Sequence, residues 1–162
     1  MNILDKLKLY INNNLEDNVI GQKSFIGRSK MSYDAMVYEE SSLTNYINNN
    51  KDEYIFRDLL FKYIDDRDLK DSDVYNKVNI DRRLFSKIRN ENYHPSKDTV
   101  ILLGLALELN EDEIDELLKS ASYSLPKNNI FDLIIRFCFK EKIYKLIEVN
   151  ELLDSYKCKT FI

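Results

Sequence analysis

Glycine, proline and cysteine are scarce in this chain. Its 162 residues include 3 glycines, 2 prolines and 2 cysteines. Because glycine and proline interrupt helices most strongly, their scarcity favours helix throughout. Cys138 and Cys158 are too few for a disulfide framework, and no His/Cys cluster in the sequence indicates a zinc site. Cys138 lies between Phe137 and Phe139, which predicts a small buried hydrophobic residue.

Long apolar runs are also missing. No run approaches the roughly 18 residues that indicate a membrane-spanning helix, and no charged segment followed by an apolar one indicates a signal peptide. We therefore expect no membrane partner and a cytoplasmic location. Hydrophobic residues nevertheless make up 44% of the chain, which is enough to form the core of a domain of ordinary size.

Residues typical of catalysis are sparse as well. The only histidine, His94, precedes Pro95, and such a residue is more often a member of a surface turn than a general base. The acid pairs Glu39-Glu40 and Asp65-Asp66 are sequence neighbours rather than two positions that converge on a cleft. We therefore predict no catalytic residue, no cofactor and no metal ligand, and we do not expect an enzyme.

A segment with two glycines, residues 21–29, superficially resembles a phosphate-binding P-loop. Five residues separate Gly21 from Gly27, and Arg28 follows. A P-loop has four residues between its glycines and then a lysine. We interpret the segment as a mobile basic loop.

The middle of the chain has the turn signals of two short helices that meet at a tight turn. Asp71-Ser72-Asp73 offers N-caps for a helix over about 72–78, and Asp81 offers one for a helix over about 82–89. Between them, Asn79 is the non-glycine residue best suited to a positive φ. The second helix would bury a stripe of three residues, Leu84, Phe85 and Ile88.

Further apolar patterns predict the helices that would support this pair. The helix over Tyr54–Leu69 carries one broad apolar stripe. Ser96 is the expected cap of the helix over Thr99–Leu109, which is apolar almost all round and therefore belongs at the centre of the domain. Asn110 and the acids after it begin an acidic helix. Its inward residues are Ile114, Leu117 and Leu118.

The order of caps, turn, Pro-Ser pair and apolar helix over about residues 54–120 resembles the lambda-repressor-like (XRE) class of helix-turn-helix domains. The resemblance implies an all-α fold and a transcriptional regulator that binds double-stranded DNA, with helix 82–89 as the recognition helix in the major groove. It also implies the contact residues. Candidate base or phosphate contacts are Asp81, Arg82, Arg83, Ser86 and Lys87, with Arg89 and Lys97 nearer the DNA backbone.

Three positions depart from the pattern of that class. Asp71 replaces a common glutamine and would repel a phosphate, Tyr75 replaces a small alanine between the two helices, and Glu91 or a neighbour replaces a common glycine. The block around Asp73–Lys97, together with the later FDLIIRF, also resembles a helical module that is appended to otherwise unrelated bacterial proteins and has no general role. A protein-interaction module that has lost DNA binding is therefore the alternative hypothesis.

Local charge favours a nucleic-acid partner. Between Lys77 and Lys97 lie six basic residues and two acidic ones, whereas the whole chain has a net charge of −4. A basic stripe on an acidic protein is typical of a surface that contacts phosphates. The same pattern also occurs on an ordinary solvated helix face.

The remaining segments complete a three-part organisation. Residues 1–51 would form an N-terminal helix over Met1–Leu15, which Asn12-Asn13-Asn14 ends, an irregular loop or weak strand over 17–40, and a short helix over Ser41–Asn50. The repressor-like domain would span 52–126. A C-terminal extension, 127–162, would contain helices over about 129–142 and 146–156.

The first helix of this extension is apolar on more than one face and must be covered. It either docks on the repressor-like core or forms a homodimer interface. Under the second alternative, the dimer or partner surface consists of Ile130, Phe131, Ile134 and Phe137. A homodimer would also suit paired half-sites on DNA.

Overall fold

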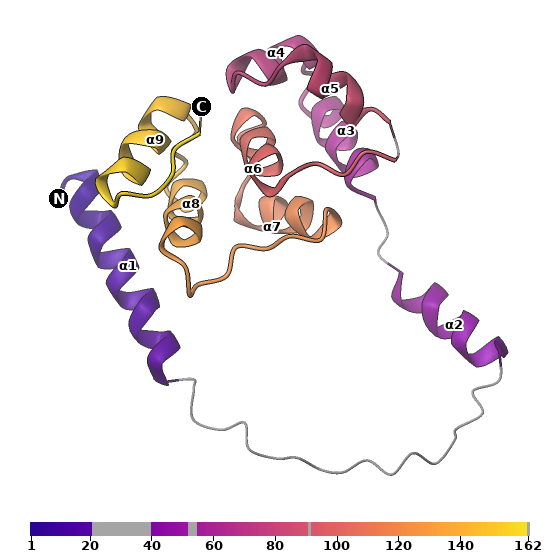
Figure 1. Cartoon of the computed structure of the whole chain (residues 1–162), viewed down its shortest axis with the longest axis horizontal. Helices are drawn as coiled ribbons and strands as arrows, with labels where there is room; N and C mark the ends of the chain where they lie inside the picture. The colour runs from indigo at the N-terminus through magenta and orange to yellow at the C-terminus, as the bar shows by residue number, and fades with distance from the viewer. Residues whose placement is uncertain (21–39, 52–54, 91, 162) are drawn as a thin grey trace.

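The computed structural model describes residues 1–20, 40–51, 55–90 and 92–161, and every regular element in these ranges is a helix (Figure 1). This confirms the all-α fold class. The helices are α1 (Ile3–Ile20), α2 (Glu40–Asn50), α3 (Phe56–Asp66), α4 (Asp71–Lys77), α5 (Arg82–Ile88), α6 (Lys97–Ala106), α7 (Glu111–Ser120), α8 (Ile130–Lys140) and α9 (Leu146–Ser155).

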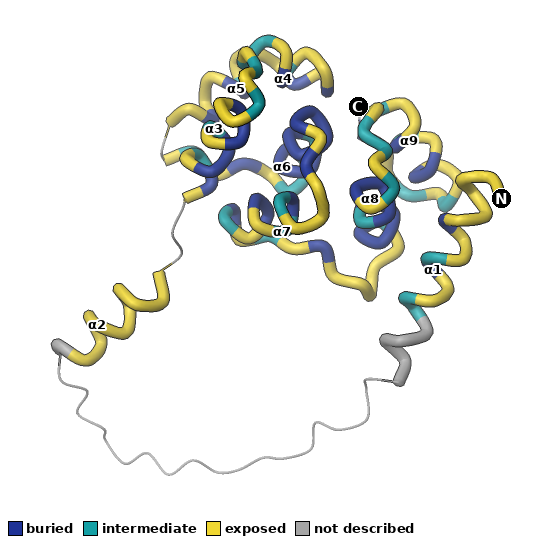
Figure 2. Tube along the Cα trace, turned by 180° about the vertical axis from the view of Figure 1, so that it is seen from behind, coloured by how far each residue is buried: buried dark blue, intermediate teal, exposed yellow. Residues whose placement is uncertain are grey.

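Helix α6 lies at the centre of the body and is buried almost along its whole length, as its sequence predicted (Figure 2). It packs against α4 and α7. Gly104 lets the side chains of Ile114 and Phe139 approach the backbone of α6 closely. A Cβ atom at this position would lie 2.4 Å from Cδ1 of Ile114 and 3.2 Å from Cζ of Phe139. The absence of a side chain at this position therefore brings α7 and α8 together on α6.

Side-chain caps begin three of these helices, and the sequence predicted two of the caps, Asp81 and Ser96. The side chains of Asp81, Ser96 and Asn110 accept hydrogen bonds from the backbone N–H groups of the second or third helical residues. Asn110 forms a full capping box, since the Glu113 carboxylate accepts in turn from the Asn110 N–H at 2.9 Å. These bonds satisfy orphan donors and fix where each helix starts.

The tight turn between α4 and α5 also has its predicted conformation. Asn79 adopts a φ of 56°, the left-handed region that asparagine tolerates better than most residues. Val78 and Ile80, on either side of it, are buried. Anchored on both sides, the turn fixes the angle at which α5 leaves α4.

Helix α8 is covered by its own chain, and two of the four residues predicted as its dimer or partner surface are buried in the core. Ile134 is 0% and Phe137 2% exposed, because α1, α7 and α9 all pack against α8. The Tyr10 ring of α1 lies 5.5 Å from that of Phe137. Phe131 is half-buried, with its ring 5.9 Å from that of Phe161, and Ile130 alone of the four is exposed. The intramolecular docking alternative is the one observed.

One hydrophobic cluster joins α1 and the helices from α3 to α9. It includes Leu7 and Ile11 of α1, Leu60 of α3 and Leu153 of α9. The hydrophobic core therefore continues across both predicted domain boundaries, between residues 51 and 52 and between residues 126 and 127.

Helix α1 corrects the prediction that three asparagines end it. The helix continues through them to Ile20. Leu7 and Ile11 bury the face that meets α8, and the Asn14 side chain donates to the Tyr10 carbonyl at 2.8 Å. Tertiary packing here overrides weak helix propensity. The predicted loop over 17–40 is wrong at its two helical ends, and the rest of it, with the P-loop-like segment, lies outside the described residues.

Candidate nucleic-acid interface

Helix α5 turns its basic side chains outward. Phe85 and Ile88 are buried and hold the helix on the body, whereas Leu84 is only half-buried. The Asp81 carboxylate accepts from the Arg83 N–H at 2.6 Å and so fixes the start of the helix. The four predicted contact residues of the helix itself are all exposed. They are Arg82, Arg83, Ser86 and Lys87.

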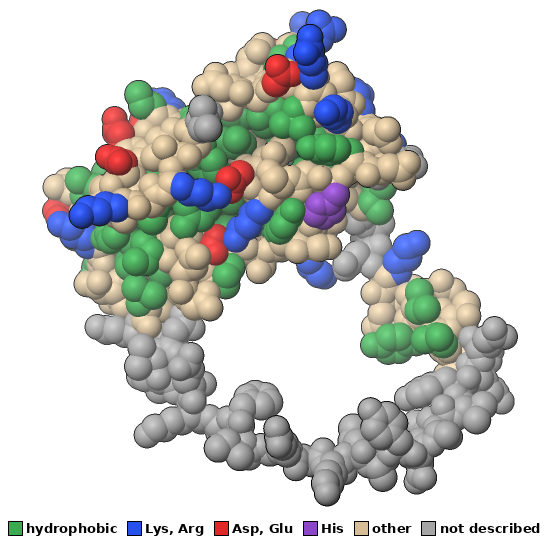
Figure 3. All heavy atoms as spheres, in the orientation of Figure 1, with side chains coloured by type: hydrophobic (Ala, Val, Ile, Leu, Met, Phe, Trp, Pro, Cys, Tyr) green, Lys and Arg blue, Asp and Glu red, His purple; other side chains and the backbone are tan. Residues whose placement is uncertain are grey.

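Three cations on this face have no acidic partner. Among the residues that the structure describes, the side chains of Arg82, Arg83 and Lys87 form no ion pair, whereas the Lys77 ammonium pairs with Glu108. Lys and Arg side chains gather at the upper edge of the molecule, over α4 and α5 (Figure 3). Because no carboxylate of the described residues pairs with them, these three charges are available to a polyanion.

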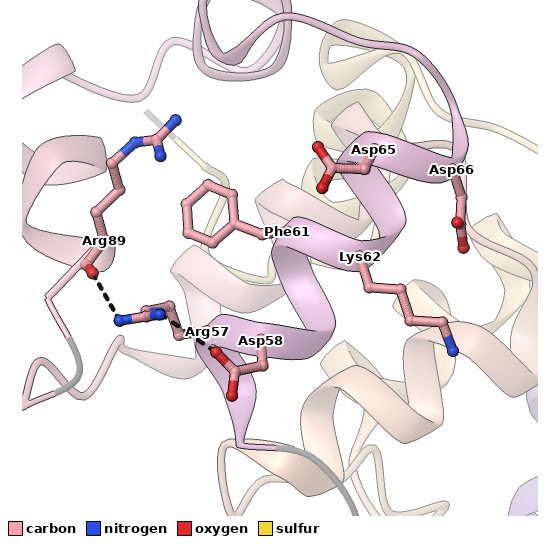
Figure 4. A pocket seen from close by; sticks show the side chains of 7 residues that line it. All are labelled: Arg57, Asp58, Phe61, Lys62, Asp65, Asp66 and Arg89. Atoms are coloured by element: carbon pink, nitrogen blue, oxygen red, sulfur yellow. Dashed lines mark hydrogen bonds and ion pairs between the residues drawn. The ribbon is translucent and has the colours of Figure 1, made fainter.

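Arg89 is held differently from the cations of α5. Its guanidinium forms an ion pair with the Asp71 carboxylate and lies 4.6 Å from the centre of the Phe61 ring. Its carbonyl oxygen accepts from Nη1 of Arg57 at 3.4 Å (Figure 4). Arg89 therefore links the end of α5 to α3 and α4. The Asp71 charge, expected to repel a phosphate, is neutralised by this pair.

Lys97 does not belong to the exposed basic face. Its ammonium lies 2.7 Å from the Asp132 carboxylate of α8, and Asp132 is only 3% exposed. A buried carboxylate needs such a partner, because removing the partner would leave a charge in the core without compensation. This ion pair gives Lys97 a structural role, and its predicted place near the DNA backbone stays a prediction. The residue joins α6 to α8.

Tyr75 packs against α5 at the position where a small alanine was expected. Its ring centre lies 5.5 Å from that of Phe85 and its side chain is half-buried. A hollow of about 730 Å³ runs between α3, α4 and α5, with Tyr75, Phe85, Arg82 and Ser86 among its lining residues. The larger residue thus contributes an aromatic contact and borders an open surface next to the basic face.

A second hollow lies along α3 and is bordered mostly by charge. Figure 4 shows its lining residues, which are Arg57, Asp58, Phe61, Lys62, Asp65, Asp66 and Arg89. The Arg57 guanidinium lies 3.3 Å from the Asp58 carboxylate. The three acids here balance the three bases, so the positive field of α5 does not extend over α3.

Groups with a raised pKa lie away from α5. Burial raises the pKa of the Cys138 thiol to about 12, which keeps it protonated and a poor nucleophile at neutral pH. Burial, and then a 2.6 Å hydrogen bond to Glu116, raise the pKa of Tyr63. The described residues form no cluster of His, Cys, Asp or Glu suited to a metal ion.

His94 and Tyr93 occupy the turn before α6. The His94 Nε2 atom lies 2.9 Å from the Ala121 carbonyl oxygen, and its ring centre lies 5.4 Å from that of Tyr123. His94 is exposed and Tyr93 is half-buried against the core. The placement of His94 agrees with its interpretation as a member of a surface turn, and Tyr93 covers part of the core.

The ion pairs of Arg89 with Asp71 and of Lys97 with Asp132 were not predicted from the sequence. Asp71 and Arg89 are 18 residues apart, and no local pattern connects them. The sequence around Asp132 does indicate a buried ion pair, because this residue is a lone carboxylate inside the apolar run of α8. A buried acid predicts a basic partner, although its identity depends on the tertiary packing.

Compared with known proteins, the chain matches no family model, no curated protein and no solved structure. In the described part of the chain, no helix combines the length and the apolar character that crossing a membrane requires.

Proposed function

We propose that the chain is a transcriptional regulator that binds double-stranded DNA through α4 and α5, with α5 in the major groove. The observation that carries the proposal is a set of three exposed cations on the outward face of α5, Arg82, Arg83 and Lys87, which form no ion pair within the described part of the chain. A tight turn at Asn79 and two buried anchors, Phe85 and Ile88, hold that face in a fixed orientation.

The roles of the individual residues follow from their chemistry. Arg82 and Arg83 lie in the first turn of α5, the part of a recognition helix that reaches base edges, where arginine pairs well with guanine. Lys87, one turn later, suits a phosphate. The Ser86 hydroxyl donates to the Arg82 carbonyl at 3.0 Å, and its oxygen can still accept a hydrogen bond from the amino group of a base.

A labelled duplex pool of random sequence tests the proposal, with anisotropy measured at increasing salt. Tight binding that weakens steeply with salt, and that Arg82→Ala with Arg83→Ala abolishes, supports it. The matched control is Lys8→Ala with Lys145→Ala, which removes two exposed positive charges away from α5. Absence of binding by the folded wild-type protein at low salt would exclude the DNA function.

The alternative is a protein-interaction module on the same scaffold. The observation that favours it is the balanced charge of the hollow along α3, where Asp58, Asp65 and Asp66 would repel a phosphate backbone that ran across this face. The same titration separates the two functions. A module without DNA affinity shows no salt-dependent anisotropy, and neither double variant changes its behaviour.

A further inference from the structure

Helix α2 presents an uncovered apolar face. Leu43, Tyr46 and Ile47 recur at the spacing that places them on one side of a helix, and they are 53%, 67% and 53% exposed. From residue 42 to residue 50 every side chain is exposed (Figure 2). An isolated helix of this length is only marginally stable in water, so α2 requires a surface that covers its apolar face.

The same chain has a groove that is itself uncovered. It lies between α1 and α8, encloses about 300 Å³, and is lined from α1 by Met1, Leu9 and Tyr10 and from α8 by Phe137. Met1 and Leu9 are 80% and 53% exposed. The polar lining is largely occupied, because Lys6 pairs with Glu141 at 3.4 Å and the Lys140 ammonium lies 5.2 Å from the centre of the Tyr10 ring.

We propose that α2 docks in the α1–α8 groove of a second copy of the chain, and that the exchange is reciprocal. Between residues 42 and 50, α2 carries no charged side chain, so it fits a groove whose charges are already paired. Its uncharged face does not suit the surface nearest to its C-terminal end, the hollow along α3, where six of the seven lining residues are charged (Figure 4).

The length of the chain favours a second copy over the chain's own groove. Five residues separate Asn50 from Phe56, and a fully extended connection of this length spans at most about 20 Å. The groove lies on the opposite side of the body, with α7 and α8 between α3 and α1 (Figure 1). Three successive helix contacts of roughly 8–10 Å already exceed that span, and the connection would have to pass around the core.

Pairing of α2 with α2 would bury too little surface. Three side chains per copy fall well short of the roughly 800 Å² per partner of a standard interface. Reciprocal docking doubles the contact, because each copy contributes one helix and one groove, as the commonest closed symmetry requires. The dimer does not depend on DNA binding, so either proposal can fail without the other.

Sedimentation of the full chain over a concentration series tests the dimer. The wild-type protein is expected to be a dimer, and Ile47→Glu and Leu9→Glu are each expected to raise its dissociation constant at least roughly tenfold. Both residues are exposed, so the variants should retain the circular dichroism and melting temperature of the wild type. Asn45→Glu and Asn12→Glu add the same charge outside the two apolar surfaces and should remain dimeric.

Mixing the two disrupted variants identifies the occupant. The Leu9→Glu chain keeps an intact α2 and the Ile47→Glu chain keeps an intact groove, so only the mixture can form one intact contact, and it should dimerise more strongly than either variant alone. A wild-type monomer at every concentration would overturn the proposal. So would a Leu9→Glu protein as dimeric as the wild type, because α2 would then dock elsewhere, and so would a mixture that dimerises no more strongly than the two variants alone.

Discussion

Helices α5 and α8 were both selected from the sequence as functional surfaces, and the structure treats them in opposite ways. Helix α5 buries only Phe85 and Ile88 and exposes its charges, whereas α8 buries Ile134, Phe137 and most of its other apolar residues. The charged pattern of α5 thus correctly predicted which face of this helix is exposed. An apolar pattern indicated only that α8 needs covering, and α1 and α9 of the same chain supply the cover.

Of the substitutions that test this comparison, Phe137→Ala should have the largest effect on stability. The side chain is 2% exposed and contacts Tyr10 of α1, so its truncation should lower the free energy of unfolding by about 3–5 kcal/mol. Chemical denaturation measures the loss. Ile130→Ala, at the exposed end of the same helix, should cost less than about 1 kcal/mol. A Phe137→Ala protein of wild-type stability would contradict the role of this side chain in holding α1 on α8.

Lys97→Ala should have the next largest effect, on stability rather than on DNA affinity. It leaves the Asp132 carboxylate buried without its partner, which should reduce the free energy of unfolding by about 2–3 kcal/mol, less than for a fully buried pair because Lys97 is partly exposed. Adding Asp132→Asn should restore much of the loss in thermal melts. If Lys97→Ala instead weakens DNA binding at unchanged stability, Lys97 belongs to the interface.

Asp71→Asn should have the smallest effect on stability, and it tests whether the Asp71–Arg89 pair limits DNA binding by α5. The pair with Arg89 is partly exposed, so its loss should change the free energy of unfolding by less than about 1 kcal/mol. DNA affinity should rise a few-fold, roughly, because one negative charge disappears and Arg89 is released toward the phosphates. Anisotropy at fixed low salt measures the change, and an unchanged or weaker affinity would show that the pair positions α5 for binding.

The sequence was sufficient for features that depend on neighbouring residues. The caps at Asp81 and Ser96 and the positive φ of Asn79 were predicted, because short side chains and local hydrogen bonds determine them. The continuation of α1 past its asparagines was not predicted, since it depends on packing against α8. A local sequence pattern therefore does not predict a helix end that tertiary contacts determine.

The candidate site divides in the same way. Arg82, Arg83, Ser86 and Lys87 are exposed as predicted, because helix periodicity alone places them opposite the buried stripe. Arg89 and Lys97 were assigned to the same surface, but carboxylates distant in sequence engage both of them. Net charge along a segment counts cations without distinguishing paired from unpaired ones, and only the fold makes that distinction.

The most direct test of the DNA function compares the salt dependence of binding for the wild type with that of the Arg82→Ala, Arg83→Ala double variant. Each phosphate contact contributes about −0.9 to the slope of log affinity against log salt, so each of the two arginines that contacts a phosphate should make the slope shallower by about one when it is removed. If α5 binds DNA, the double variant should lose most of its affinity for DNA and keep its fold, because both side chains are exposed. Equal affinity and equal slope for the two proteins would contradict it.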